Sequence, residues 1–212
     1  MDKEQLYEQL RSKDRNLKNI ADKTADNKGI IKHLIDGLGE NNADVKFGSS
    51  NTLIIISERY PEFLYPFFDF FTDELGNKNN FIKWGSLSII ANLTKIDEER
   101  KFDRIFSRYF SEIAGPVMIT AANIIKGAAV IAVYKPYLTG KITNELLKIS
   151  DGIYQTSECK NIVLGHMVSA FDKFFQQVEN KKDVLVLIEK QADNPRNATA
   201  KKAQKFIKKW VK

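Results

Sequence analysis

Few side chains in this sequence are of the types that carry out catalysis. The only cysteine is Cys159, and the only histidines are His33 and His166. Cys159 and His166 are seven residues apart, so on one helix they share a face. Ser157 is the expected N-cap of that helix, and the helix dipole there would activate the thiol. Seven residues span about 10 Å along a helix, which is too far for the direct hydrogen bond of a Cys–His dyad. We therefore expect no catalytic residue.

Metal and cofactor sites also lack support. Two histidines and one cysteine cannot supply the closely spaced ligands of a zinc site, and one cysteine cannot form an intrachain disulfide. The glycine-containing stretch 37–40 lacks the third glycine and the preceding strand of a dinucleotide-binding loop. We expect no metal, no cofactor and no small-molecule substrate, and hence a protein that is not an enzyme.

Lysine is the residue type that offers most for binding. Lys46, Lys83 and Lys160 each lie near the start of an expected helix, and Trp84 adjoins one of them. A ladder of cations beside an aromatic ring would suit an acidic peptide or a nucleic-acid backbone. The alternative is that these lysines stabilise turns between repeats. Asp44 is close to Lys46 in the sequence but no acidic residue is close to Lys83, so we expect Lys83 and Trp84 to be at least partly exposed.

A second group of cations lies at the C-terminal end. The formal net charge is +6, and residues 181–212 carry ten basic and three acidic residues, a net +7. On a helical wheel the lysines of 198–212 gather on one side and the apolar residues on the other. This pattern is typical of a terminal capping helix with one solvated face. The functional alternative is contact with phosphate or anionic lipid through Lys201, Lys205, Lys208 and Lys212.

Aromatic residues crowd the segment 63–71, which we expect to be part of one helix that begins near Pro61 and contains Pro66. No single helix face can hold all of them, so the segment predicts either a core helix between two layers or a hydrophobic partner site. The six residues are Phe63, Tyr65, Phe67, Phe68, Phe70 and Phe71.

Helices are the elements that must position these residues. Apolar residues recur at steps of three and four, and the alternation typical of strands is nearly absent. The apolar runs Leu53–Ile56 and Ala128–Val133 have helical spacing around them, so we interpret both as buried helices. Breaks at short, regular intervals predict eleven or twelve helices, and no linker marks a domain boundary. Four prolines lie at or beside these breaks: Pro61, Pro116, Pro136 and Pro195.

A short pattern repeats along the chain. A β-branched residue, a lysine, an aromatic residue, a glycine and a serine occur in Val45–Ser49 and again, 37 residues later, in Ile82–Ser86. Ile119–Ala122 is a degenerate third copy, and further copies begin near Cys159 and Ala198. Helix pairs that recur every 37 to 42 residues are typical of an α-solenoid, in which stacking of neighbours buries the apolar faces.

These helix starts resemble those of the HEAT/armadillo superfamily. Asp44 and Lys46 match the acidic residue before the turn and the basic residue at the second helix in that family. The second copy keeps Lys83 but has Phe81 in the acidic position, and the third copy keeps neither. The resemblance implies an all-α fold: a right-handed α-solenoid of about five HEAT-like helix pairs.

The resemblance also implies a division of the chain. Residues 27–212 would form the repeat array, with 1–26 as N-terminal capping helices and 195–212 as a basic C-terminal capping helix. The charged N-terminal segment shows no signal peptide, and no apolar run reaches the length of a membrane helix. We therefore expect a cytoplasmic protein with no membrane partner.

The second helices of this superfamily line a concave surface, which implies a function in binding. The leading hypothesis is a non-enzymatic scaffold that binds a protein or peptide partner on that surface through Lys46, Lys83, Trp84 and Lys160. The alternative is a nucleic-acid binder similar to the HEAT-like DNA glycosylases, although the tryptophans here are only Trp84 and Trp210. A role like that of the HEAT-like bilin lyases is a third possibility that rests on the fold alone.

Overall fold

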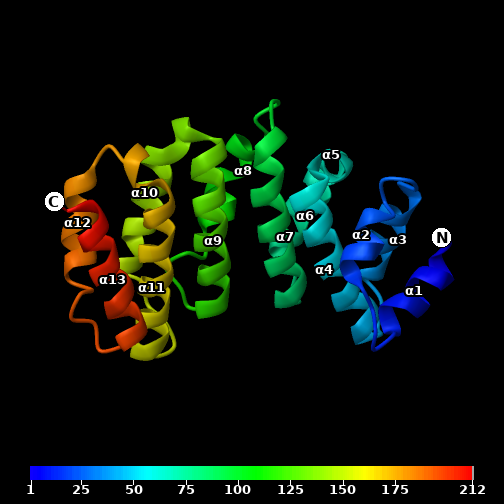
Figure 1. Ribbon diagram of the computed structural model, residues 1–212, viewed down its shortest axis with the longest axis horizontal. Coiled ribbons are helices and arrows are strands. Elements are labelled where there is room, and N and C mark those ends of the chain that lie inside the picture. Colours follow the sequence, from blue (N-terminus) through cyan, green and yellow to red (C-terminus); the bar gives the residue numbers. More distant parts are fainter. Residues whose placement is uncertain (212) are drawn as a thin grey trace. The chain divides into compact units, whose positions relative to one another are not determined.

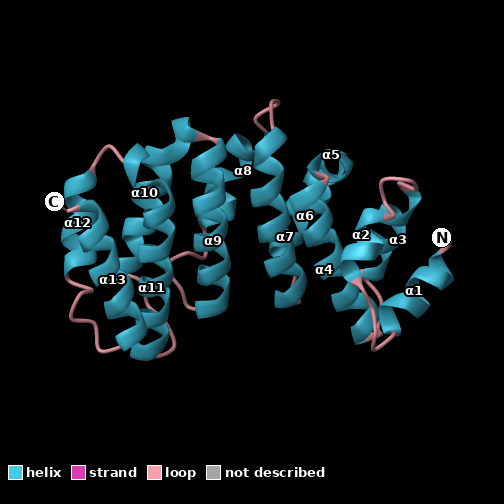
Figure 2. Ribbon diagram, in the orientation of Figure 1, coloured by secondary structure: helices cyan, strands magenta, loops and turns pink. Residues whose placement is uncertain are grey.

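The computed structural model describes residues 1–211, and within this range helices joined by short turns account for the regular structure (Figure 1 and Figure 2). No strand occurs among the described residues. The chain divides into two compact units, Met1–Arg104 and Ile105–Lys212. The division falls inside helix α8 (Lys101–Phe110), at a point where the sequence contains no linker.

The first unit is organised around one long helix, α4, which contacts α1, α2, α3, α5 and α7. The predicted apolar run of α4 is helical, with Leu53 and Ile56 fully buried and Ile54 and Ile55 partly exposed. The unit contains α1 (Lys3–Arg11), α2 (Leu17–Asp22), α3 (Gly29–Gly37), α4 (Ala43–Arg59), α5 (Pro61–Leu64), α6 (Phe68–Asp73) and α7 (Asn80–Leu93).

Short polar side chains fix the starts of these helices. Asp2 and Gln5 form a reciprocal capping box at α1, in which each side chain accepts a hydrogen bond from the backbone N–H of the other residue. Asn42 caps α4 by accepting from the N–H of Val45, and Asn79 caps α7 by accepting from the N–H of Phe81. Each cap satisfies an N–H that has no partner inside its helix, so the sequence sets these boundaries locally.

The aromatic segment is not the single helix that the sequence predicts. A 3₁₀ turn at Tyr65–Phe67, which contains Pro66, separates α5 from α6. Proline has no N–H to donate, so the α-helical ladder is interrupted there and the chain changes direction. The change of direction lets Phe68 and Phe71 be buried completely, while the other four aromatic residues of the segment are partly exposed.

Buried Asp97 connects two parts of the first unit. One of its carboxylate oxygens accepts hydrogen bonds from the Tyr65 hydroxyl at 2.7 Å and the Lys101 N–H at 2.8 Å, and the other accepts from the Phe102 N–H at 3.1 Å. Asp97 therefore caps the start of α8 and ties it to the aromatic segment. The burial of Tyr65 and its hydrogen bond to this carboxylate raise the pKa of the phenol.

The second unit stacks long helices side by side. Helix α11 packs between α9 and α13, and Figure 1 shows the three as neighbouring, roughly parallel helices. The shorter α10 and α12 contact each other, and α12 also packs against α13. Ala128–Val133 lies within α9, as expected. The unit contains α9 (Met118–Tyr134), α10 (Thr139–Leu147), α11 (Ser157–Phe174), α12 (Lys181–Glu189) and α13 (Asn197–Trp210).

The repeat period appears in the helix starts and in the hydrogen bonds between repeats. Helices α4, α7, α9, α11 and α13 begin at residues 43, 80, 118, 157 and 197, so successive starts lie 37, 38, 39 and 40 residues apart. We call these five the second helices. Within the first unit, Arg59 pairs with Asp22, 37 residues earlier, at 2.6 Å. Within the second unit, Lys209 pairs with Asp172, also 37 residues earlier, at 2.8 Å.

Candidate binding surfaces of the two units

Three aromatic side chains form an exposed cluster in the first unit. The ring centroids of Phe47 on α4 and Phe81 on α7 are 4.4 Å apart, and those of Phe81 and Trp84 are 5.7 Å apart. Phe81 is 46% exposed and the other two are partly exposed. We call Phe47, Phe81 and Trp84 the aromatic cluster. It gives two consecutive second helices a shared apolar surface.

The first-unit lysines that the sequence singled out flank this cluster. Lys46 precedes Phe47 and Lys83 precedes Trp84, and both lysines are partly exposed. Asp44, which the sequence offered as the partner of Lys46, forms an ion pair with Arg15 at 2.7 Å. Arg15 follows α1 and Asp44 lies in the first turn of α4, so this ion pair ties the N-terminal segment to α4. A role for Lys46 and Lys83 in binding a partner stays a prediction.

Cationic side chains surround His166 in the second unit. His166 lies on α11 and is partly buried; burial lowers its pKa, and the positive charges of Lys202, Lys126 and Arg196 lower it further. Every charged group that shifts the pKa of this histidine is therefore a cation. We call Lys126, His166, Arg196 and Lys202 the cationic cluster. Its members come from α9, α11 and the start of α13.

Lys202 joins α13 to α11 within the cationic cluster. Its Nζ donates a hydrogen bond to the Gly165 carbonyl oxygen at 3.2 Å, although the residue is exposed. Burial, and then the charge of Arg196, lower the pKa of Lys202. An ammonium whose charged form is disfavoured by its surroundings gains free energy when an anion approaches it.

Two carboxylates are bound by basic residues across the contact between α11 and α13. Asp172 accepts hydrogen bonds from Lys209 Nζ and Trp210 Nε1, both at 2.8 Å. Burial raises the pKa of Asp172, but these hydrogen bonds outweigh burial and hold the pKa below its usual value. Glu158 forms an ion pair with Arg196. These pairs join α13 to α11. Among residues 1–211, Lys126 and Lys202 are the cations of the cluster that form no ion pair with a carboxylate.

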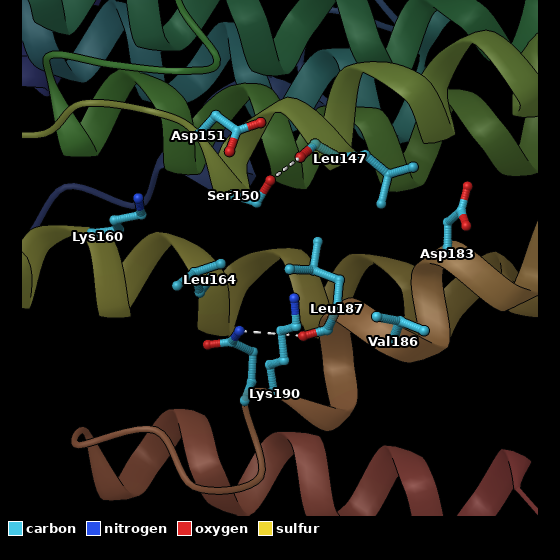
Figure 3. A pocket seen from close by; sticks show the side chains of 10 residues that line it. Leu147, Ser150, Asp151, Lys160, Leu164, Asp183, Val186, Leu187 and Lys190 are labelled. Atoms are coloured by element: carbon cyan, nitrogen blue, oxygen red, sulfur yellow. Dashed lines mark hydrogen bonds between the residues drawn. The ribbon is translucent and has the colours of Figure 1, made fainter.

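Lys160 lines a different surface, a groove of about 490 Å³ between α10, α11 and α12 (Figure 3). The side chains of Leu147, Leu164 and Leu187 form its apolar part. Lys160 and Asp151 lie toward one end of the groove in Figure 3. Lys190 and Asp183 also line it, so this groove carries both signs of charge. The contact of Lys160 with a partner stays a prediction.

The C-terminal lysines separate into two groups on α13. All five lysines of α13 are exposed, but Lys202 and Lys209 are also hydrogen-bonded to α11, whereas the other three are Lys201, Lys205 and Lys208. On the opposite side Ala203 and Phe206 are buried, while Ile207 and Trp210 are partly exposed. The amphipathic pattern predicted for this helix is therefore present. Lys212, the fourth lysine predicted to contact anions, lies outside the described residues.

Replacing the exposed lysines tests whether they serve only as a solvated face. Because Lys201, Lys205 and Lys208 lie on the exposed side of α13, the triple substitution to glutamine should shift the melting temperature by no more than about 2 °C. Lys209→Ala, which removes a bond to Asp172, is the comparison and should destabilise by about 1 kcal/mol. Circular dichroism melts measure both. A large loss in the triple variant would contradict the solvated-face interpretation.

Cys159, which was considered for catalysis, lies in the first turn of α11. Thr156, rather than the predicted Ser157, caps α11, because its hydroxyl accepts the Cys159 N–H at 3.0 Å. Cys159 is partly exposed and unpaired. Among residues 1–211, no group of three or more histidine, cysteine, aspartate or glutamate side chains could hold a metal ion. None of the helices in this range has the length and apolar character needed to cross a membrane.

Comparison with solved structures decides the fold class. The chain is similar to a designed armadillo repeat protein, YIII(Dq)4CqI, with a TM-score of 0.59 and 17% sequence identity over 98% of this chain and 99% of that chain. This chain has a HEAT/armadillo-like α-solenoid fold. The likeness covers nearly the whole length of both chains and shows the fold alone. No protein-family model matches the sequence, and no curated protein matches it.

The second helices bring together residues that the sequence did not connect: Lys126 and Lys202 both act on His166. One signal could have identified Lys126: it is the only charged residue in α9, which is otherwise apolar or neutral. A lone lysine in such a helix must lie on its solvent-facing side, because burial of an unpaired ammonium is costly.

Proposed function

We propose that this protein is a non-catalytic scaffold that binds a segment of another protein through the second-helix surface of its first unit. The aromatic cluster carries the proposal. Aromatic side chains bury large areas and are enriched among the residues that dominate the energetics of protein interfaces. Phe81 is exposed at the centre of the cluster, with Phe47 and Trp84 on either side.

The charges beside the cluster indicate what kind of segment fits. Lys46 and Lys83 are each adjacent in sequence to a member of the cluster and are partly exposed. A segment with an apolar side chain for the aromatic rings and an acidic flank would match both features. The sequence-based prediction of a concave binding surface through Lys46, Lys83 and Trp84 enters this proposal, and Lys160 would belong to a separate surface in the second unit.

Peptide selection tests the proposal. Peptides selected from a random library on the immobilised wild-type protein should bind Phe81→Asp at least about 10-fold more weakly, because the charge removes an aromatic anchor worth about 2 kcal/mol. The measurement is the fluorescence anisotropy of labelled peptides. Ile153→Asp is the control, because Ile153 is 80% exposed, lies in the second unit and does not line the groove around Lys160.

Two outcomes would contradict this proposal. One is a selection that enriches no peptide above background; the other is a set of selected peptides that bind Phe81→Asp as tightly as the wild type. Circular dichroism of both variants checks that they are folded, which the exposure of both positions leads us to expect.

A further inference from the structure

The cationic cluster of the second unit faces a surface that also has exposed aliphatic side chains. Ile119, Lys126 and Val133 follow one another at seven-residue intervals on α9, so they lie on one side of that helix. Ile119 is 44% exposed and Val133 is 45% exposed, and Lys126 is exposed as well. On α11, Ile162 and His166 are four residues apart and both are partly exposed. The surface therefore alternates aliphatic and cationic groups.

We propose that this surface binds an acidic peptide segment with aliphatic side chains, laid across α9, α11 and α13. It is separate from the aromatic cluster and lies in the other unit, and it extends the proposed function by naming the chemistry of a partner. Lys126 and Lys202 supply the charges that a carboxylate-bearing chain would meet. Ile162 supplies an apolar contact for an aliphatic side chain of the peptide, and Ile119 and Val133 lie about 10 Å to either side of Lys126 along α9.

Several features favour a peptide over a nucleic acid. Non-specific nucleic-acid surfaces stack bases on aromatic rings along a continuous positive groove. Here the exposed aromatic residues of this region, Tyr134 and Tyr137, lie at the C-terminal end of α9 and in the turn after it, whereas Ile119 and Val133 on the Lys126 side of α9 are aliphatic. The carboxylates of Glu158 and Asp172 lie between α11 and α13, where they would repel an unbroken row of phosphates. A peptide can instead place its carboxylates only where cations are available.

Helix spacing sets the register of such a peptide. Packed helices lie about 8–10 Å apart, and an extended chain rises about 3.3 Å per residue. About three residues therefore separate contacts with adjacent second helices. Lys126 lies on α9, whereas Lys202 Nζ is hydrogen-bonded to the Gly165 carbonyl oxygen of α11, so carboxylates that reach the two ammonium groups should be about three residues apart. A valine or leucine between them would lie near Ile162 on α11.

Binding of a designed peptide tests this inference. The probe is a fluorescein-labelled peptide with two glutamates about three residues apart and valines between them, and its anisotropy is measured with the full-length protein. Lys126→Glu and Lys202→Gln should each weaken binding at least about fivefold. Lys141→Glu on α10, an exposed lysine away from the cluster, is the matched control and should bind as the wild type does.

Two further probes, a basic peptide and an oligonucleotide, test whether the surface prefers an acidic peptide. A peptide with lysines in place of the glutamates should not bind, and a single-stranded oligothymidine of similar length should bind more weakly than the acidic peptide. Tighter binding of the oligonucleotide that is lost in Lys126→Glu would overturn the inference and assign the surface to nucleic acid. No binding of the acidic peptide, or equal binding to Lys126→Glu, would also overturn it. Neither result bears on the first unit, whose proposed function is tested with Phe81→Asp.

Discussion

Gly85→Leu should lower the free energy of unfolding by about 3 kcal/mol or more. Gly85 lies where α7 approaches α4, and a Cβ at this position would be 2.5 Å from Ser50 Oγ and 4.0 Å from Ile54 Cδ1. A leucine adds three more carbons that this contact cannot accommodate, so the helices must move apart. Denaturant unfolding followed by circular dichroism measures the loss.

Two further glycine variants test how the loss of stability depends on the space around each glycine. Gly48→Leu should also destabilise, but by less, because its Cβ would meet the flexible end of Leu10 at 3.0 Å. Gly140→Ala is the control: no atom lies within 4 Å of a Cβ there, so the variant should be neutral or more stable by up to about 1 kcal/mol. If Gly85→Leu and Gly48→Leu both unfold like the wild type, the close helix contacts are not as described.

Asp97→Ala is expected to cost about 3 kcal/mol or more. Asp97 is only 4% exposed, and its carboxylate accepts the hydrogen bonds of Tyr65, Lys101 and Phe102. Alanine leaves these donors without their acceptor and removes the cap of α8, and each unmet buried donor costs about 1–3 kcal/mol. Thermal and denaturant unfolding of the full chain measure the change.

Conservative variants distinguish the hydrogen bonds from simple loss of volume. Asp97→Asn keeps one acceptor oxygen at nearly the same volume, so we expect it to retain part of the stability that Asp97→Ala loses. Tyr65→Phe removes only one donor to Asp97 and should cost about 1 kcal/mol. Stability equal to the wild type in Asp97→Ala would show that the carboxylate does not organise the start of α8.

The two proposed binding surfaces would bind a partner through different interactions, apolar burial at one and charge at the other. The aromatic cluster offers burial of large apolar side chains, which depends weakly on salt. The cationic cluster offers charge, so binding there should weaken as ionic strength rises. A partner that used both would be recognised by separate segments, one for each unit.

The sequence by itself determined the helical character of the chain and its period. Helix starts are set by side chains within a few residues, such as Asn42 at α4 and Asn79 at α7, and apolar residues spaced by three and four define each buried face. The repeated Lys-aromatic-Gly-Ser pattern predicted second helices 37 residues apart, and α4 and α7 begin 37 residues apart. These features are local, and for that reason they can be identified in a single sequence.

Only the tertiary structure decided which distant side chains meet. Asp44 pairs with Arg15, and Lys126 and Lys202 both act on His166. These pairings join residues 29 to 40 positions apart, and they depend on how each helix is rotated against the next. That rotation results from the packing of many side chains at once, which no short motif encodes.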